Sequence, residues 1–281
     1  MKQARTFASS VVLDYDTLWI VGGEGMMEYL NTTELIKIDS NQEISHCNGI
    51  ELPFAFYRHR MVQYNSSAIF LIGGFKFEFL NNRGFLSGET WIFDPKKNFE
   101  YRKGPPLMNT DRYLFSCAKM KIQNNATVIV VAGGQNWSNK SEIFDSVEIF
   151  FPTLGWKSGP TMPYKVYDSA MTTSLDGKGV ILSGGYNSTN SSYNHTDGPL
   201  DTIIELRVNE LNNELEWIIK NQTLKTPRRA HVMFLVPNKC CDDNATSNIV
   251  DPITIHNYCE IFPNNHVENA SLQWTVIIGT V

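Results

Sequence analysis

Residues 68–75, AIFLIGGF, decide the fold, because a run of apolar residues as long as one β-strand ends there on two adjacent glycines. A short apolar run bounded by turn residues is typical of a buried strand. Glycine adopts the positive φ that other residues enter only at a cost. The same combination recurs in LWIVGGEG (18–25), VIVVAGGQN (128–136) and VILSGGYN (180–187). Four copies at a spacing of about 50 to 60 residues indicate a repeat protein.

Other features recur in register with the glycine pairs. An arginine or tyrosine marks the start of the first strand in each unit, at Arg5, Arg58, Arg112, Tyr167 and Arg228. A third strand-like segment follows each pair, such as ETWIFDPKK, and an outer segment follows around Cys47, Tyr101, Trp156, Trp217 and Trp274. Four short strands per unit, without helical periodicity, predict an all-β fold. Such a unit repeated around a ring is a β-propeller blade.

The pattern of arginine or tyrosine, apolar strand, Gly-Gly, ETWIFDP and W…G-P-x-M-P resembles the kelch repeat and covers residues 3–279. The resemblance implies a single domain, a kelch-type β-propeller of four-stranded blades. The expected blades are 3–52, 53–107, 108–162, 163–225 and 226–279. The fifth unit has the arginine and the third strand but no glycine pair. Kelch propellers most often have six blades, so either five units close by packing alone or about one blade is absent from this sequence.

The composition excludes some classes of function. The chain has 281 residues, of which 42% are hydrophobic and 19% charged. Its net charge of −5 provides no basic surface for nucleic acid. The longest apolar runs are only as long as a strand, so no membrane-spanning helix is expected. The N-terminal MKQARTFASS lacks the apolar core of a signal peptide.

No pattern of catalytic residues stands out. The six histidines include no H-x-H or H-x-x-x-H pair that would indicate a metal site. The glycine pairs lack the lysine or third glycine of a phosphate-binding loop. The sequence therefore predicts no enzymatic activity, no metal and no cofactor. A disulfide from Cys240 or Cys241 to Cys259 is expected to staple the fifth unit, and a zinc site that also uses His256 is the alternative.

Asn-x-Ser/Thr sequons are more frequent than the roughly four that chance would produce, which suggests glycosylated surface loops. The eleven sequons start at Asn31, Asn65, Asn125, Asn136, Asn139, Asn187, Asn190, Asn194, Asn221, Asn244 and Asn269. A secreted protein whose N-terminal segment lies outside this sequence explains both the sequons and the missing signal peptide. The alternative interpretation is an asparagine-rich genome with polar loops.

The resemblance to kelch adaptors of ubiquitin ligases implies ligand contacts at the strand starts and just after the glycine pairs. These positions are Arg5, Arg58, Arg112, Tyr167 and Arg228, with Glu24, Phe75, Gln135 and Tyr186 after the pairs. Several arginines at one end of a propeller suit an acidic or carboxylate-bearing ligand. The alternative is that these arginines hold neighbouring turns together.

The function expected from the sequence is therefore a non-enzymatic, extracellular binding module. It would recognise a protein or glycan through the loop face of the propeller. An intracellular scaffold or substrate-recognition adaptor is one alternative, and a structural matrix component is another.

Overall fold

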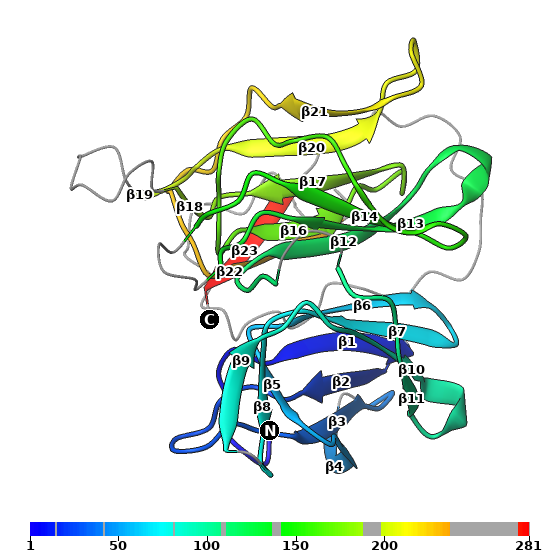
Figure 1. Cartoon of the computed structure of the whole chain (residues 1–281), viewed down its shortest axis with the longest axis vertical. Helices are drawn as coiled ribbons and strands as arrows, with labels where there is room; N and C mark the ends of the chain where they lie inside the picture. Colours follow the sequence, from blue (N-terminus) through cyan, green and yellow to red (C-terminus); the bar gives the residue numbers. More distant parts are fainter. Residues whose placement is uncertain are drawn as a thin grey trace.

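The chain folds into successive antiparallel sheets. The computed structural model describes residues 1–14, 16–41, 43–80, 82–107, 111–136, 142–187, 198–236 and 275–280. These residues form β-strands and two short 3-10 helices, Pro95–Lys97 and Gln123–Asn125. Four sheets of four strands follow one another along the chain, from the bottom of Figure 1 to its top. The prediction of an all-β fold built from four-stranded units is confirmed for these four units.

Each sheet runs from an inner to an outer strand in sequence order. The first sheet contains β1 (Ser9–Asp14), β2 (Thr17–Val21), β3 (Thr32–Ile38) and β4 (Ile44–Glu51). The second contains β6 (Arg60–Asn65), β7 (Ala68–Ile72), β10 (Thr90–Asp94) and β11 (Glu100–Lys103). The third contains β12 (Ser116–Lys121), β13 (Thr127–Ala132), β14 (Val147–Phe151) and β15 (Gly155–Ser158). The fourth contains β16 (Ala170–Thr173), β17 (Gly179–Ser183), β20 (Ile203–Val208) and β21 (Leu215–Ile219).

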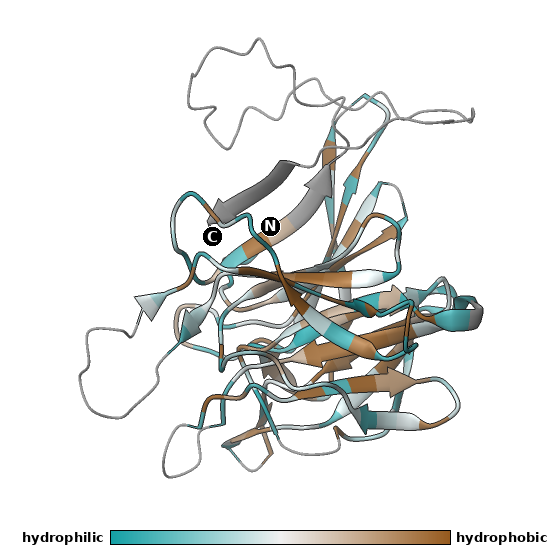
Figure 2. Ribbon diagram, turned by 90° about the horizontal axis from the view of Figure 1, so that it is seen from above, coloured by the Kyte–Doolittle hydropathy of each residue, from teal (hydrophilic) through white to brown (hydrophobic). Residues whose placement is uncertain are grey.

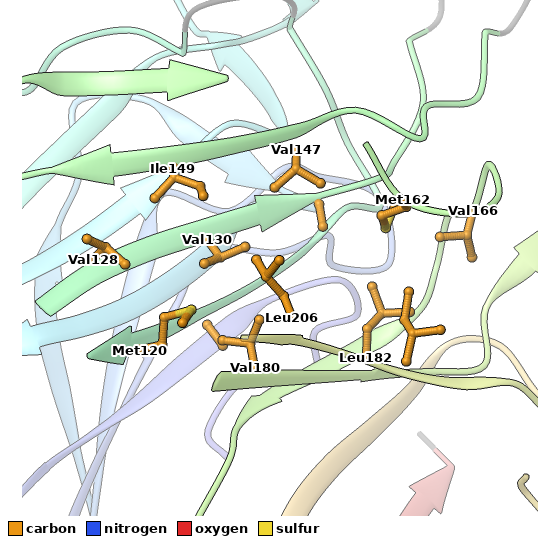
Figure 3. Close-up of a cluster of buried hydrophobic side chains, with 13 residues drawn as sticks. Met120, Val128, Val130, Val147, Ile149, Met162, Val166, Val180, Leu182 and Leu206 are labelled. Atoms are coloured by element: carbon orange, nitrogen blue, oxygen red, sulfur yellow. The ribbon is translucent and has the colours of Figure 1, made fainter. Parts of the chain in front are cut away.

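The apolar runs before the glycine pairs are buried on both faces. In β7, Ile69 and Leu71 pack toward the first sheet, whereas Phe70 and Ile72 pack toward the third. Successive side chains of a strand point to opposite faces, so a strand between two packed sheets is apolar throughout. Figure 2 shows this as brown strands. A further cluster, which includes Val130, lies between the third and fourth sheets (Figure 3).

The glycine pairs join each sheet to the next one. All eight glycines have positive φ, between 56° and 99°. The N–H of Gly74 donates to the backbone carbonyl of Arg112 at 3.0 Å, and the N–H of Gly134 donates to that of Val166 at 2.8 Å. A Cβ on Gly133 would lie 2.4 Å from the Val166 carbonyl oxygen. Left-handed backbone and close approach of the next sheet therefore both require glycine here.

A buried ion pair lies beside the glycine pair in two sheets. Arg112 donates to Glu148 Oε1 at 2.6 Å and to the carbonyl oxygen of Gly133 at 3.0 Å, and both charged side chains are fully buried. Arg5 and Glu34 form the same pair in the first sheet at 2.7 Å. These arginines bind within their own sheets and are covered by protein.

Apolar side chains occupy the same two positions in the other sheets. By backbone register, Val166 and Ile204 replace the ion pair in the fourth sheet. Phe56 and Trp91 replace it in the second sheet. The fold therefore accepts either an ion pair or an apolar pair at this place.

The fifth unit differs from the expected arrangement. Its inner strand β22 (His231–Val236) lies beside β16 and pairs directly with β23 (Thr275–Thr280). The prediction of an outermost strand around Trp274 is wrong, because the strand that follows this residue pairs with the inner strand and so takes the place of a second strand. An apolar run next to an aromatic residue is compatible with either the second or the outermost strand of a unit, so the sequence pattern could not distinguish the two positions. The expected third strand, 256–264, lies outside the described residues.

Two small sheets were not predicted from the sequence. One contains β5 (Ala55–Tyr57), β8 (Phe75–Glu78) and β9 (Arg83–Leu86), and the other contains β18 (Tyr186–Asn187) and β19 (Gly198–Pro199). The inner strands contact one another in the order β1, β6, β12, β16 and β22, and the described residues show no closed ring.

Replacing Arg112 by alanine is expected to destabilise the protein by about 3–5 kcal/mol, because the carboxylate of Glu148 would remain buried without the positive charge of Arg112. The double variant Arg112→Val/Glu148→Ile copies the fourth sheet and is expected to regain most of this loss. Urea unfolding of the three proteins measures the difference. A double variant as unstable as the single one would show that the bonds to the glycine carbonyl, rather than the ion pair, hold the sheet.

Candidate functional site

Each inner strand is preceded by a residue with left-handed backbone. These residues are Phe7, Arg58, Leu114, Asp168 and Ala230, with φ between 52° and 59°. Backbone hydrogen bonds join neighbours in the row, from Arg58 N to Phe7 O at 2.9 Å and from Asp168 N to Leu114 O at 2.7 Å. Ala230 N donates in turn to Asp168 O at 3.0 Å. The row therefore lies along one end of the inner strands.

In the first four units, the residue before the left-handed position pairs with the residue after the glycine pair. The backbone pairs are Thr6 with Glu24, Tyr57 with Phe75, Tyr113 with Gln135, and Tyr167 with Tyr186. We call these pairs and the row of left-handed residues the mouth. It lies toward the left of Figure 1, where β18 and β19 extend. The structure thus brings the predicted residues Glu24, Phe75, Gln135, Tyr167 and Tyr186 to one end.

The predicted arginines do not share one position. Arg5, Arg112 and Arg228 stand two residues before the left-handed residue, whereas Arg58 is itself left-handed. Tyr167 stands one residue before. The side chains of Arg5 and Arg112 are only 1% and 0% exposed, which corrects the expectation that they face a ligand. Arg228 is half-buried, and its Nε donates to the carbonyl oxygen of Thr226 at 3.2 Å.

Sequence reasoning missed Tyr57, Tyr113, Arg60 and Arg229 at the mouth. The signal was present in FYRHR, RYLFS and VYDSA, which align on their tyrosines. Aligning on arginine instead shifted the second unit by two residues. The tyrosine is the better marker because it faces the residue after the glycine pair in three sheets.

Aromatic rings support two mouth arginines. The guanidinium carbon of Arg58 lies 4.3 Å from the ring centroid of Phe7 and 5.6 Å from that of Tyr113. That of Arg229 lies 5.0 Å from the ring centroid of Tyr186. When arginine stacks on an aromatic face, the N–H donors in the plane of its guanidinium group can still bind another group.

The mouth carries excess positive charge. Burial raises the pKa of Asp168, although Arg60, Arg229 and Arg58 act to lower it. None of these three arginines forms a salt bridge with a carboxylate in the part of the chain that the structure describes. Three guanidinium groups therefore act electrostatically on one half-buried carboxylate.

A stack of rings extends from the mouth along the small sheet β5–β8–β9. Tyr57 stacks on Phe75 with ring centroids 5.0 Å apart and on Tyr29 with centroids 4.6 Å apart, both at an interplanar angle of 13°. Phe75 meets Tyr113 at 4.8 Å. Burial is the main cause that raises the pKa values of Tyr57 and Tyr113 above the usual range. These tyrosines are therefore neutral at physiological pH.

Two histidines next to the mouth are buried. His59 is fully buried, and neither ring nitrogen has a hydrogen-bond partner. Burial, helped by Arg60, lowers its pKa to about 3. His231 lies 3.1 Å from Ser183 Oγ through Nε2, and burial lowers its pKa to about 4. Both histidines are neutral near pH 7.

The predicted modification sites fall into two groups. Among those described, Asn65, Asn125 and Asn221 are exposed, Asn136 and Asn187 are half-buried, and Asn31 donates from Nδ2 to the Leu52 carbonyl at 3.0 Å. Outside the described residues lie Asn139, Asn190, Asn194, Asn244, Asn269, Cys240, Cys241 and Cys259. Cys47 and Cys117 are free thiols, and burial raises the pKa of Cys117 to about 12.

The described residues contain neither a cluster of metal ligands nor a membrane-spanning helix. No three His, Cys, Asp or Glu side chains there come together as metal ligands. No helix in that part of the chain has the length and apolar character needed to cross a bilayer.

The comparisons with known proteins concern the fold alone. No protein-family model matches the chain, and no curated protein matches it in sequence. The solved structure of YjhT is similar, with a TM-score of 0.61, and the match covers 82% of this chain and 74% of that chain. Only 16% of the residues are identical, so the similarity shows the fold alone.

Phe115 occupies the position in the third unit that His59 occupies in the second, directly after the left-handed residue. Replacing His59 by phenylalanine is expected to flatten the pH dependence of the free energy of unfolding. Unfolded histidine titrates near pH 6.5, whereas folded His59 has a pKa of about 3. Its stabilising contribution is therefore complete above pH 6.5 and is lost as the pH falls toward 3, by up to about 1.4 kcal/mol per pH unit. Urea unfolding between pH 7 and pH 5 tests this, and equal slopes for the two proteins would contradict it.

Proposed function

We propose that this chain is a kelch-type β-propeller module that binds an anionic group of a protein or glycan at its mouth and has no catalytic activity. The observation that carries the proposal is the set of three arginines, Arg58, Arg60 and Arg229, without a salt-bridge partner among the described carboxylates. Arginine binds carboxylate and sulfate or phosphate groups through paired hydrogen bonds. The neighbouring tyrosines add rigid contact area.

The repeating contacts support the kelch assignment. In each of the four complete sheets, the second strand ends on a glycine pair whose second N–H donates to the unit that follows. Together with the recurring sequence pattern, this favours blades of a propeller over an unrelated row of sheets. The fifth unit, with two described strands, leaves open both five blades and an incomplete ring of six.

The protonation states near the mouth support binding rather than acid–base catalysis. His59 and His231 are buried and neutral, and Tyr57, Tyr113 and Tyr167 have raised pKa values. A general base needs a pKa near the working pH and access to the substrate. An intracellular adaptor would use the same mouth, so this geometry does not depend on the compartment.

An extracellular, glycosylated protein is the proposed setting. Asn65 and Asn125 lie at the ends of the first turns of their sheets, opposite the glycine pairs, and are exposed. Asn221 is exposed after β21. Glycans at Asn65 and Asn125 would leave the mouth accessible, because the turn between a first and a second strand lies at the far end of the sheet.

The double variant Arg58→Ala/Arg229→Ala is expected to weaken binding of an acidic ligand at least tenfold, because two guanidinium groups are lost. The probes are a fluorescein-labelled glutamate-rich peptide, its glutamine counterpart, and a labelled uronic-acid oligosaccharide, compared by fluorescence anisotropy. Arg102→Ala, an exposed arginine on β11, serves as the control. Equal binding of the glutamine peptide, no binding of either acidic probe, or unchanged binding by the double variant would contradict the proposal.

Treatment with an N-glycosidase is expected to increase the electrophoretic mobility of the protein isolated from its own source, because exposed sequons accept glycans in the secretory pathway. Changing Asn65, Asn125 or Asn221 to glutamine should each remove one step of the shift. Asn31→Gln should remove none, since its amide is half-buried and bonded. Absence of any shift would contradict an extracellular setting.

A further inference from the structure

Four large apolar side chains project from two loops beside the mouth. Met26, Met27 and Leu80 are 100%, 97% and 100% exposed, and Phe79 is 48% exposed. Met26 and Met27 belong to the loop between β2 and β3, and Phe79 and Leu80 follow β8. We call these four residues the tip patch. Fully exposed side chains add nothing to the buried core, so folding does not explain them.

Ring contacts bring the two loops together. Tyr29, from the first loop, lies 5.1 Å from Phe77 on β8, and Phe77 lies 5.5 Å from Phe79. Tyr29 also stacks on Tyr57 at 4.6 Å. The two loops therefore share a base of packed rings, which brings the segments that carry the tip patch close together.

Carboxylates flank the methionine pair in the sequence EGMME. Glu24 and Glu28 form no salt bridge with the basic groups of the described residues. The side-chain amide of Gln3 donates to Glu28 Oε1 at 2.8 Å, which leaves the negative charge of Glu28 uncompensated. A partner with lysine or arginine beside apolar residues would match this pattern of charge.

We infer that the tip patch is a docking surface for a cationic, amphipathic segment of a partner protein. Methionine side chains adapt to different apolar partners because they are flexible and polarisable. Basic residues of the segment would pair with Glu24 and Glu28, while its apolar residues would cover Met26, Met27 and Leu80.

The other occupants fit the patch less well. A neutral sugar would leave the carboxylates of Glu24 and Glu28 without a cationic partner. An anionic membrane would be repelled by the two carboxylates. A second copy of this chain would meet the same acidic loop, with like charges facing each other across a symmetric contact. The cationic segment alone satisfies both the apolar tips and the carboxylates.

The test uses a fluorescein-labelled amphipathic peptide of leucine and lysine, titrated with the whole chain in fluorescence anisotropy. Two matched peptides carry serine for leucine or glutamate for lysine. The leucine and lysine peptide is expected to bind, and the other two at least tenfold more weakly. The variant Met27→Ser/Leu80→Ser should weaken binding at least tenfold, since two apolar side chains lose their buried contact.

Matched variants separate docking from general attraction to an acidic protein. Leu211→Ser removes an equally exposed leucine, 97% exposed, from the turn between β20 and β21 and should leave binding unchanged. Glu24→Gln/Glu28→Gln should weaken binding at least threefold and reduce its dependence on salt. Because the substituted tips are exposed, their variants should keep the melting temperature of the parent.

Several outcomes would overturn the inference. These are no binding of the leucine and lysine peptide, equal binding of the glutamate peptide, or equal loss with Leu211→Ser. Concentration-dependent dimerisation in analytical ultracentrifugation that Met27→Ser/Leu80→Ser abolishes would assign the patch to a second copy. Binding to phosphatidylcholine vesicles that the same variant abolishes would assign it to lipid.

Discussion

The hydrogen bond from the second glycine of each pair to the unit that follows is the constraint on which the other features depend. The donor is a backbone N–H at the end of a buried strand, and the acceptor is the carbonyl two residues before the next left-handed residue. The bond requires two successive residues with positive φ and no Cβ, which only a glycine pair provides without strain. It closes the end of one sheet and sets the point at which the next sheet begins.

Because this bond fixes the backbone, side chains near it can vary widely. The same two places hold Arg112 with Glu148 in one sheet and Val166 with Ile204 in the next. The attraction within a buried ion pair must offset the cost of desolvating both charges, so its net contribution to stability is close to that of a well-packed apolar pair. The sheets can therefore keep one backbone while their sequences diverge. This explains why an arginine is a poor marker of the repeat although it is buried where it occurs.

The glycine pairs and the apolar runs were sufficient to predict four four-stranded sheets, because those residues follow from backbone conformation and burial on both faces. Positions at the mouth were predicted less accurately. Glu24, Phe75, Gln135 and Tyr186 come directly after the glycines, so their place follows from the strand. Arg58 is itself a left-handed residue of the row, whereas Arg112 stands two residues before Leu114, and only the backbone conformation and hydrogen bonds reveal this difference. The sheet β5–β8–β9 forms between distant segments that have no common repeat signal.

The mouth and the tip patch lie next to each other and share Glu24. Three arginines outnumber the carboxylates at the mouth, whereas Glu24 and Glu28 flank the tips. Tyr57 joins the two, because it stacks on Tyr29 beneath the tips and on Phe75, which contacts Tyr113 beside Arg58. A change in this stack would disturb both surfaces at once. Met27 and Leu80 are almost fully exposed, and Arg229 lies over Tyr186, outside this stack, so substitution of these residues leaves the stacked rings in place.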